Sequence, residues 1–175
     1  MDIKSLVRTI PDYPSPGIMF RDVTTLLSHA EGFYACINGL SAPYKTMSID
    51  VVAGIEARGF ILGGAVADRL GTGFVPIRKH GKLPATTVQE SYELEYGVDI
   101  IEVHEDAISR NENVLIVDDL IATGGTAEAA IKLVRKLGGN IIGACFVVDL
   151  PDLGGSKVIQ DMGIACRSLI QFDGE

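Results

Sequence analysis

Apolar runs and helical stretches alternate along most of this chain. Runs rich in Val, Ile and other apolar residues predict buried strands at residues 49–53, 73–77, 98–103, 114–117, 140–150 and 165–172. Apolar side chains at helical spacing, or an excess of good helix formers, predict helices at residues 2–10, 23–40, 60–70, 127–137 and 156–162. Because strands alternate with helices, the pattern predicts an α/β fold with a central, mainly parallel sheet flanked by helices.

Two segments depart from this alternation. Residues 11–17 contain three prolines, which cannot continue a helix and predict an extended or turned connection. Residues 85–101 predict a β-hairpin, because apolar or aromatic residues alternate with glutamates from Tyr92 to Tyr96. No linker, repeat or low-complexity segment divides the chain, so residues 1–175 are expected to form one domain.

The composition of the chain argues against nucleic acids and membranes as partners. The chain has 175 residues, and 47% of them are hydrophobic, which is enough for a sizeable core. Lys and Arg number 15 against 23 Asp and Glu, and the net charge of −8 argues against broad attraction to nucleic acids or membranes. No apolar run approaches the roughly 20 residues that span a bilayer, and the first residues lack the pattern of a signal peptide. A cytoplasmic protein is therefore expected.

Cysteines and histidines give no sign of a metal site or a catalytic triad. The three cysteines lack the spacing of metal ligands and are expected to be reduced, small apolar side chains. The three histidines are equally dispersed along the chain. These residues are Cys36, Cys145, Cys166, His29, His80 and His104.

The stretch from Val114 to Thr126 carries the most informative motif. Two carboxylates, Asp118 and Asp119, follow a buried strand, and a Thr-Gly-Gly-Thr loop then leads into a helix. Glycines let a backbone approach a phosphate closely, and the free N–H groups and dipole of a helix start favour its negative charge. The carboxylates suit the neutral hydroxyls of a ribose, or a metal ion. A phosphate cradle beside a diol clamp predicts a site for ribose 5-phosphate.

The loop at residues 123–126 does not match the common nucleotide-binding motifs. A Walker A loop needs a lysine before its final Ser or Thr, and Gly125 stands there instead; the dinucleotide fingerprint G-x-G-x-x-G is also missing from this stretch. A tight turn with a threonine cap would account for the two glycines, but not for both acidic residues and both threonines together.

Two further loops carry cations. Arg58 follows the predicted strand 49–53 within a glycine-flanked loop, and residues 78–82 hold three cations and a histidine. Such residues are often parts of solvated surface turns. They also suit pyrophosphate, which is a dense anion.

Together these motifs resemble those of the type I phosphoribosyltransferases, in particular the adenine-specific branch. Residues 118–126 resemble the family's motif for phosphoribosyl pyrophosphate (PRPP), and residues 54–59 its pyrophosphate-binding loop. Residues 14–22, 78–84 and 91–97 resemble the base-binding hood, the basic loop and the mobile catalytic loop of the branch. The order is the family's order over nearly the whole chain. The resemblance implies the type I phosphoribosyltransferase fold, with a small N-terminal hood near residues 1–30 and a mobile β-hairpin loop near residues 80–100.

The resemblance also implies a role for individual residues. Catalysis is assigned to Glu95, Tyr96 and Arg58. PRPP is expected to contact Asp118, Asp119, Ala122, Thr123, Gly124, Gly125 and Thr126. Pyrophosphate is expected to contact Glu56, Ala57, Arg58, Arg78, Lys79 and Lys82. Adenine is expected to stack between Phe20 and Leu120, with its edge read by the backbone of Met19 and with Arg21 nearby.

Three further features are implied. Mg²⁺ is expected as the cofactor, held mainly by the oxygens of PRPP and not directly by the protein. The pyrophosphate loop of the family often carries a cis peptide that does not involve proline, which predicts one between Glu56 and Ala57. A homodimer is expected.

The function implied is transfer of ribose 5-phosphate from PRPP to adenine, giving AMP and pyrophosphate, a reaction of purine salvage. Two alternatives stay open. A non-enzymatic regulator that senses PRPP would keep the fold and the donor site, but would be expected to carry a DNA-binding domain or a basic surface. A phosphoribosyltransferase for xanthine or another 6-oxopurine is closer, although the hood and the Leu94-Glu95-Tyr96 stretch favour adenine.

The Glu95→Gln variant is expected to bind PRPP but to lose turnover. The carboxylate is assigned to proton exchange or hydrogen bonding with a ring nitrogen of adenine, which the amide cannot replace. Titration calorimetry with PRPP and initial rates of pyrophosphate release measure the two properties. Unchanged turnover would remove Glu95 from the mechanism.

Overall fold

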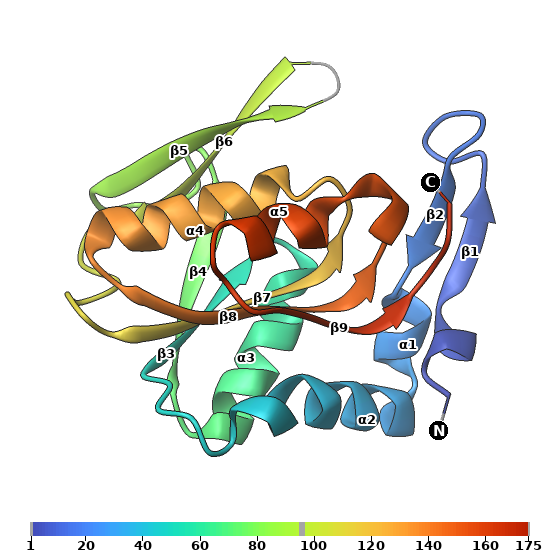
Figure 1. Ribbon diagram of the computed structural model, residues 1–175, viewed down its shortest axis with the longest axis horizontal. Coiled ribbons are helices and arrows are strands. Elements are labelled where there is room, and N and C mark those ends of the chain that lie inside the picture. Colours follow the sequence, from blue (N-terminus) through green and yellow to red (C-terminus); the bar gives the residue numbers. More distant parts are fainter. Residues whose placement is uncertain (1, 95–96, 175) are drawn as a thin grey trace.

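A seven-stranded sheet forms the centre of the molecule. The computed structural model describes residues 2–94 and 97–174, and its sheet has the strand order β5-β6-β4-β3-β7-β8-β9 (Figure 1). The parallel strands are β4 (Gly73–Lys79), β3 (Val51–Ile55), β7 (Asn113–Ile121), β8 (Asn140–Asp149) and β9 (Cys166–Gln171). The antiparallel hairpin of β5 (Thr87–Leu94) and β6 (Gly97–His104) forms one edge. The predicted α/β architecture is confirmed.

Helices cover both faces of the sheet. On one face, α1 (Thr24–Ser28), α2 (Ala30–Ser41) and α3 (Arg58–Leu70) pack on the strands; on the other lie α4 (Gly125–Leu137) and α5 (Gly155–Asp161). Short 3-10 turns occur at Lys4–Leu6, Ala42–Tyr44 and Pro151–Leu153. Within residues 2–94 and 97–174, no helix has both the length and the apolar character needed to cross a membrane.

The position of β7 in the sheet explains its unbroken apolar run. The side chains from Val114 to Val117 are all fully buried. Val114 and Ile116 belong to the apolar cluster under α4, whereas Leu115 and Val117 belong to the cluster under α2 and α3. Alternate residues point to opposite faces of a strand, so a strand with helices on both sides needs apolar residues at every position.

The N-terminal segment is a small two-stranded sheet, and the predicted helix at residues 2–10 is wrong. Only the Lys4–Leu6 turn is helical, whereas β1 (Arg8–Pro11) pairs antiparallel with β2 (Met19–Asp22). Backbone pairing with a segment further along the chain overrides the local helical spacing. We call β1 and β2 the hood; they lie at one end of the molecule, beside the last described residues of the chain (Figure 1).

Several other boundaries differ from those predicted. The helix expected at residues 23–40 is split at His29, whose ring Nδ1 accepts the N–H of Gly32, 3.1 Å away, and so caps α2. The strand expected at 98–103 is the second strand of the hairpin. The central strand extends to Ile121, beyond the expected end at Val117, so the acidic pair lies within the strand.

Glycines let α3 lie close to β3. A Cβ atom on Gly54 would come within 2.6 Å of the carbonyl oxygen of Gly59 and of the Phe74 ring. On Gly63, one turn further along α3, it would come within 2.8 Å of the same ring. The close approach sets where α3 begins at the edge of the sheet.

The Gly54→Ala variant is expected to lose about 1–3 kcal/mol of unfolding free energy, because the added methyl group overpacks the contact between β3 and α3. Gly64→Ala is the matched control, since nothing lies within 4 Å of a Cβ there and alanine favours a helix. Urea unfolding followed by circular dichroism measures both. Equal stabilities for the two variants would contradict the packing argument.

Candidate functional site

Three loops meet at the carboxyl edge of the parallel strands. In the sheet, β3 lies between β4 and β7, with Ile55 opposite Ile77 and Gly54 opposite Val117. The residues that follow these strands therefore emerge side by side. Ligands of open α/β sheets bind at this edge. The predicted PRPP and pyrophosphate residues of the described chain come from these segments.

The loop after β7 forms a small cavity in front of the α4 N-terminus. Its volume is about 190 Å³, and it is lined by Asp118, Leu120, Ile121, Ala122, Thr123, Gly124, Gly125, Thr126, Ala127 and Phe146. Gly124 is the N-cap, with φ +88°, and in this part of the described chain no side chain caps the helix. The first N–H groups of the helix are thus free for an anion.

Gly155, the first residue of α5, supports this loop from behind. Its N–H donates to the carbonyl oxygen of Ala122 at 2.9 Å. A Cβ atom at residue 155 would lie 2.3 Å from that same oxygen and 2.7 Å from the nitrogen of Gly124. The shape of the loop therefore depends on a residue that the sequence motif does not contain.

The acidic pair has two different environments. Asp119 is buried and forms an ion pair with Arg58. Burial raises the pKa of Asp118 well above its usual range, and the charge of Asp119 adds to the effect. The Oδ1 atom of Asp118 accepts the N–H of Asp119 at 2.8 Å. Because its pKa is raised, the carboxyl of Asp118 is readily protonated and can donate as well as accept a hydrogen bond with a ribose hydroxyl.

Glu56 accepts hydrogen bonds from three basic residues at and after the end of β4. Its Oε2 accepts from Nε of Arg78 at 3.1 Å and from the N–H of Lys79 at 2.8 Å, and its Oε1 from Nζ of Lys82 at 2.6 Å. Burial raises the pKa of Glu56, but these donors outweigh it and the net pKa is lowered. The peptide between Glu56 and Ala57 is cis, which confirms that prediction.

Lys79 points toward the hairpin, apart from the other cations. Its Nζ pairs with Asp99 and lies 2.6 Å from the hydroxyl of Tyr92, which donates to Asp99 at 3.0 Å. On the other side, Nζ of Lys136 on α4 pairs with Glu90 at 2.5 Å. The hairpin is thus held to the rest of the protein at two places. Sequence patterns gave no sign of these partners, because each pair joins separate elements.

A larger cavity of about 640 Å³ lies beside the loop after β7. It is lined by Ile18, Met19, Phe20, Arg21, Arg58, Glu93, Leu94, Leu120, Ala122, Thr123, Leu150 and Leu153. We call it the base cavity. All four predicted adenine residues line it. The sequence motifs did not indicate Leu150 and Leu153 as cavity residues. The signal that could have done so is their position just after β8, the neighbour of β7.

Two of the hood residues in this cavity have defined partners. The Phe20 ring meets the Tyr13 ring edge to face, with 5.2 Å between their centroids. The guanidinium of Arg21 donates to the Thr9 hydroxyl at 2.7 Å and stacks on Phe172 at 4.4 Å. Arg21 therefore ties the hood to the C-terminal segment, which places Phe20 at the cavity wall.

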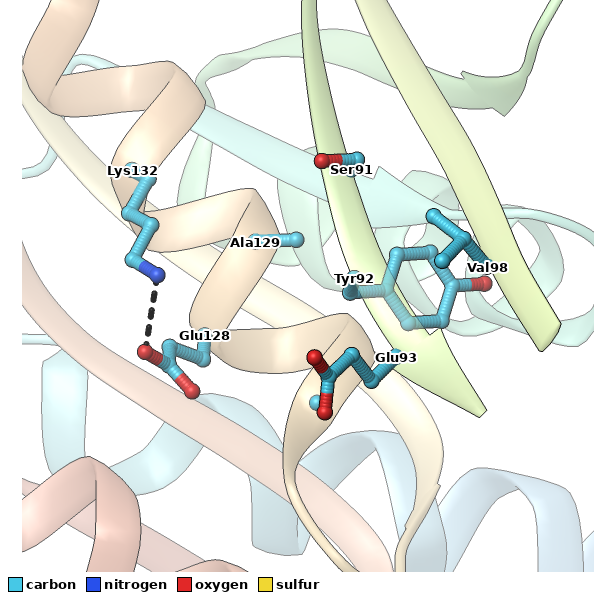
Figure 2. A pocket seen from close by; sticks show the side chains of 8 residues that line it. Ser91, Tyr92, Glu93, Val98, Glu128, Ala129 and Lys132 are labelled. Carbon is cyan, nitrogen blue, oxygen red and sulfur yellow. Dashed lines mark ion pairs between the residues drawn. The ribbon is translucent and has the colours of Figure 1, made fainter. Parts of the chain in front are cut away.

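A further cavity of about 420 Å³ separates the hairpin from α4. Ser91, Tyr92, Glu93 and Val98 face Glu128 and Lys132 across it, and these last two form an ion pair at 2.9 Å (Figure 2). Glu93 also lines the base cavity, so the hairpin borders both spaces. The predicted catalytic residues Glu95 and Tyr96 lie outside the described residues.

The described part of the chain has few side chains placed to bind a metal ion directly. In residues 2–94 and 97–174, no group of three or more His, Cys, Asp or Glu side chains is arranged to hold one. Asp118, one of the acidic pair at the end of β7, lines the cavity in front of α4. Mg²⁺ commonly uses one or two carboxylates and completes its coordination with water and substrate oxygens.

The comparisons with known proteins agree with this geometry. A family model described as a phosphoribosyl transferase domain matches residues 23–170. An adenine phosphoribosyltransferase of Rhodopseudomonas palustris is 62% identical over 99% of this chain and 87% of its own length. The solved adenine phosphoribosyltransferase of Rhodothermus marinus has a TM-score of 0.92 at 49% identity, covering 97% of this chain and 96% of that one. The Saccharomyces cerevisiae enzyme, solved with an imino-altritol bisphosphate and adenine, has a TM-score of 0.90 at 38% identity, covering 97% of each chain.

Removing the Asp22 carboxylate is expected to loosen the hood and to lessen its sensitivity to acid. Hydrogen bonds from Thr24 and from Arg8 lower the pKa of Asp22 to about 2. Because this pKa is lower in the folded state, the stabilisation is complete above pH ~4 and is lost as the pH falls toward ~2. Asp22→Asn should cost about 1 kcal/mol at pH 7 and much less at pH 2.5, measured by urea unfolding.

The control for this variant is Asp161→Asn, which removes an exposed carboxylate paired with Lys157 and should have little effect at either pH. An Asp22→Asn deficit of the same size at both pH values would contradict the role of the ionised carboxylate.

Proposed function

This chain belongs to the phosphoribosyltransferase family, and on that premise we propose that it transfers ribose 5-phosphate from PRPP to adenine, giving AMP and pyrophosphate. The function predicted from the sequence is confirmed by the adenine phosphoribosyltransferases that resemble nearly the whole chain. The single observation that carries the proposal is the direct contact between the phosphate cradle at the α4 N-terminus and the base cavity under the hood: Leu120, Ala122 and Thr123 line both.

In this proposal the donor lies along the loop after β7. The 5-phosphate of PRPP takes the free N–H groups at the start of α4, with the hydroxyls of Thr123 and Thr126 as further donors. The ribose hydroxyls bond to Asp118 and Asp119, and the raised pKa of Asp118 lets its carboxyl donate as well as accept. This arrangement fixes C1 of the ribose near the edge of the base cavity.

The leaving pyrophosphate is assigned to the cations of the two neighbouring loops. Arg58 leaves 45% of its side chain exposed beside Asp119, and Arg78 and Lys82 converge on Glu56. These groups stabilise the charge that develops as the bond between C1 and pyrophosphate breaks. Lys79 is assigned to the same role, although its amine faces Asp99 on the hairpin.

Mg²⁺ is the expected cofactor, and the residues present fit it. The oxygens of PRPP would supply most of the ligands, and Asp118 and Asp119 are the nearby carboxylates. When bound, the ion would neutralise part of the charge on the pyrophosphate. The protein's own share is to keep the acidic pair and the basic residues in fixed positions.

Adenine is assigned to the space between Phe20 and Leu120. Offset stacking on an aromatic ring suits a purine. Met19 stands opposite Pro11 in the hood, and Pro11 has no N–H to donate to the Met19 carbonyl. That oxygen is therefore suited to the 6-amino group of adenine, whereas a 6-oxopurine would present a second acceptor.

The reaction is expected to proceed through a sugar with oxocarbenium character, because pyrophosphate leaves before the base has fully attacked. Holding adenine close to C1 replaces a bimolecular encounter by an oriented one. Glu95 is assigned to the ring nitrogen whose basicity changes during attack, and Tyr96 to covering the site. Closure of the hairpin excludes water, which would otherwise hydrolyse PRPP.

A place in purine salvage follows from the substrates, since the reaction recovers a free base as a nucleotide. A cytoplasmic location is part of the proposal, because PRPP carries several negative charges and is costly to move through an apolar layer. The homodimer implied by the resemblance remains a prediction.

A comparison of bases tests the proposed function. Pyrophosphate release from PRPP and Mg²⁺ is measured with adenine, hypoxanthine, guanine and xanthine in parallel. Adenine is expected to be preferred by at least about a hundredfold in kcat/KM, because a 6-oxo group leaves the Met19 carbonyl unpaired. Preference for hypoxanthine would support a 6-oxopurine enzyme, and no release with any base would support the PRPP-binding regulator.

A further inference from the structure

One buried carboxylate has no part in the site described so far. Glu102 lies on β6, is 2% exposed, and stands opposite Arg78 in the antiparallel pairing of β4 with β6. Burying a charge is costly unless donors surround it. The donors to the Glu102 carboxylate are the Leu83 N–H at 3.1 Å, the Gln89 amide at 3.2 Å and the Thr87 hydroxyl at 3.4 Å. The Nδ1 atom of His80 lies 3.3 Å from the same carboxylate.

The turn after β4 supplies most of this stabilisation. Burial raises the pKa of Glu102, but backbone N–H groups of Leu83, Gly81 and Lys82, together with His80, outweigh it and leave the pKa lowered. The carboxylate is therefore ionised at neutral pH. The hydrogen bond from the Leu83 N–H to this buried anion fixes the path of the backbone at the end of the turn.

This backbone path decides where the basic side chains lie. Gly81 has φ +79°, and the turn that it allows brings Nζ of Lys82 to 2.6 Å from Oε1 of Glu56. The carbonyl oxygen of Lys82 in turn accepts from Nη1 of Arg78 at 3.4 Å. The basic turn is thus held between two carboxylates, Glu56 on the side of the site and Glu102 on the side of the hairpin.

We propose that Glu102 is a positioning residue for the pyrophosphate end of PRPP, acting through the turn at residues 81–83. The proposal rests on the proposed function. Among the described residues that line the base cavity, none comes from this turn or from β6. Loss of the Glu102 charge should therefore weaken the hold on PRPP and pyrophosphate and leave the hold on adenine intact.

The experiment compares Glu102→Gln with Glu105→Gln, an exposed position three residues further along. Glu102→Gln keeps the shape of the side chain but replaces the carboxylate, which only accepts hydrogen bonds, by an amide. The NH2 group of that amide would face donors. Its KM for PRPP, and for pyrophosphate in the reverse reaction, should rise about tenfold, whereas its KM for adenine and its kcat at saturating PRPP stay within about threefold. Glu105→Gln should behave like the parent enzyme.

A double-mutant cycle tests the route of the effect. In a Lys82→Met background, Glu102→Gln should raise the KM for PRPP by less than about twofold, because the side chain that it positions is already gone. Full multiplication of the two effects would overturn the proposal. So would a parent-like KM for PRPP, or an equal rise in the KM for adenine, in a Glu102→Gln protein whose parent releases pyrophosphate with adenine.

A further variant covers the case in which Glu102→Gln does not fold. Gly81→Ala disturbs the same turn through its positive φ, with nothing within 4 Å of the added Cβ atom. It should show the same selective rise in the KM for PRPP. A parent-like Gly81→Ala enzyme would overturn the proposal. An inactive parent would instead count against the proposed function itself.

Discussion

The parallel pairing of β3 with β4 on one side and β7 on the other is the constraint on which the site depends. It puts the ends of three strands at one edge, so that loops separated by tens of residues in sequence become neighbours. The register cannot slip by one residue, since β7 buries alternate side chains in two separate apolar clusters and a slip would exchange them. Core packing on both faces therefore fixes the positions of Arg58, Arg78 and Asp118 before any ligand is considered.

Ion pairs fix the directions of the basic side chains at this edge of the sheet. In this acidic chain, the cations assigned to pyrophosphate are each paired with a carboxylate: Arg58 with Asp119, Arg78 and Lys82 with Glu56, and Lys79 with Asp99. Such pairs reduce the net positive charge that a ligand meets. In return they fix the directions of long, flexible side chains, whose ordering would otherwise oppose binding. A net charge of −8 is thus compatible with a site for a dense anion.

The parts of the site that the sequence predicted are those whose chemistry requires contiguous residues. The cradle at residues 122–126 is a single loop, and its glycines and hydroxyls stand in order along the chain. The hood escaped prediction as a strand pair because residues 2–10 have helical spacing and their partner lies beyond the prolines. Glu102 is one charged residue within an apolar run, and its donors lie 13 to 19 positions earlier, in the basic turn and in β5, so no local pattern marks it. Gly155 is similar: its importance comes from a contact with Ala122, which only the folded chain reveals.

The anchoring of the hairpin has a thermodynamic consequence. Glu90 is bound to Lys136, and Asp99 to Lys79, so each strand has an attachment to the body of the protein. The free energy needed to order a segment grows with the number of residues that lose conformational freedom. In the proposed closure over the substrates, the anchored hairpin therefore has less conformational freedom to lose than a free segment of the same length. In that proposal, more of the intrinsic binding energy of PRPP and adenine is left to lower the activation barrier.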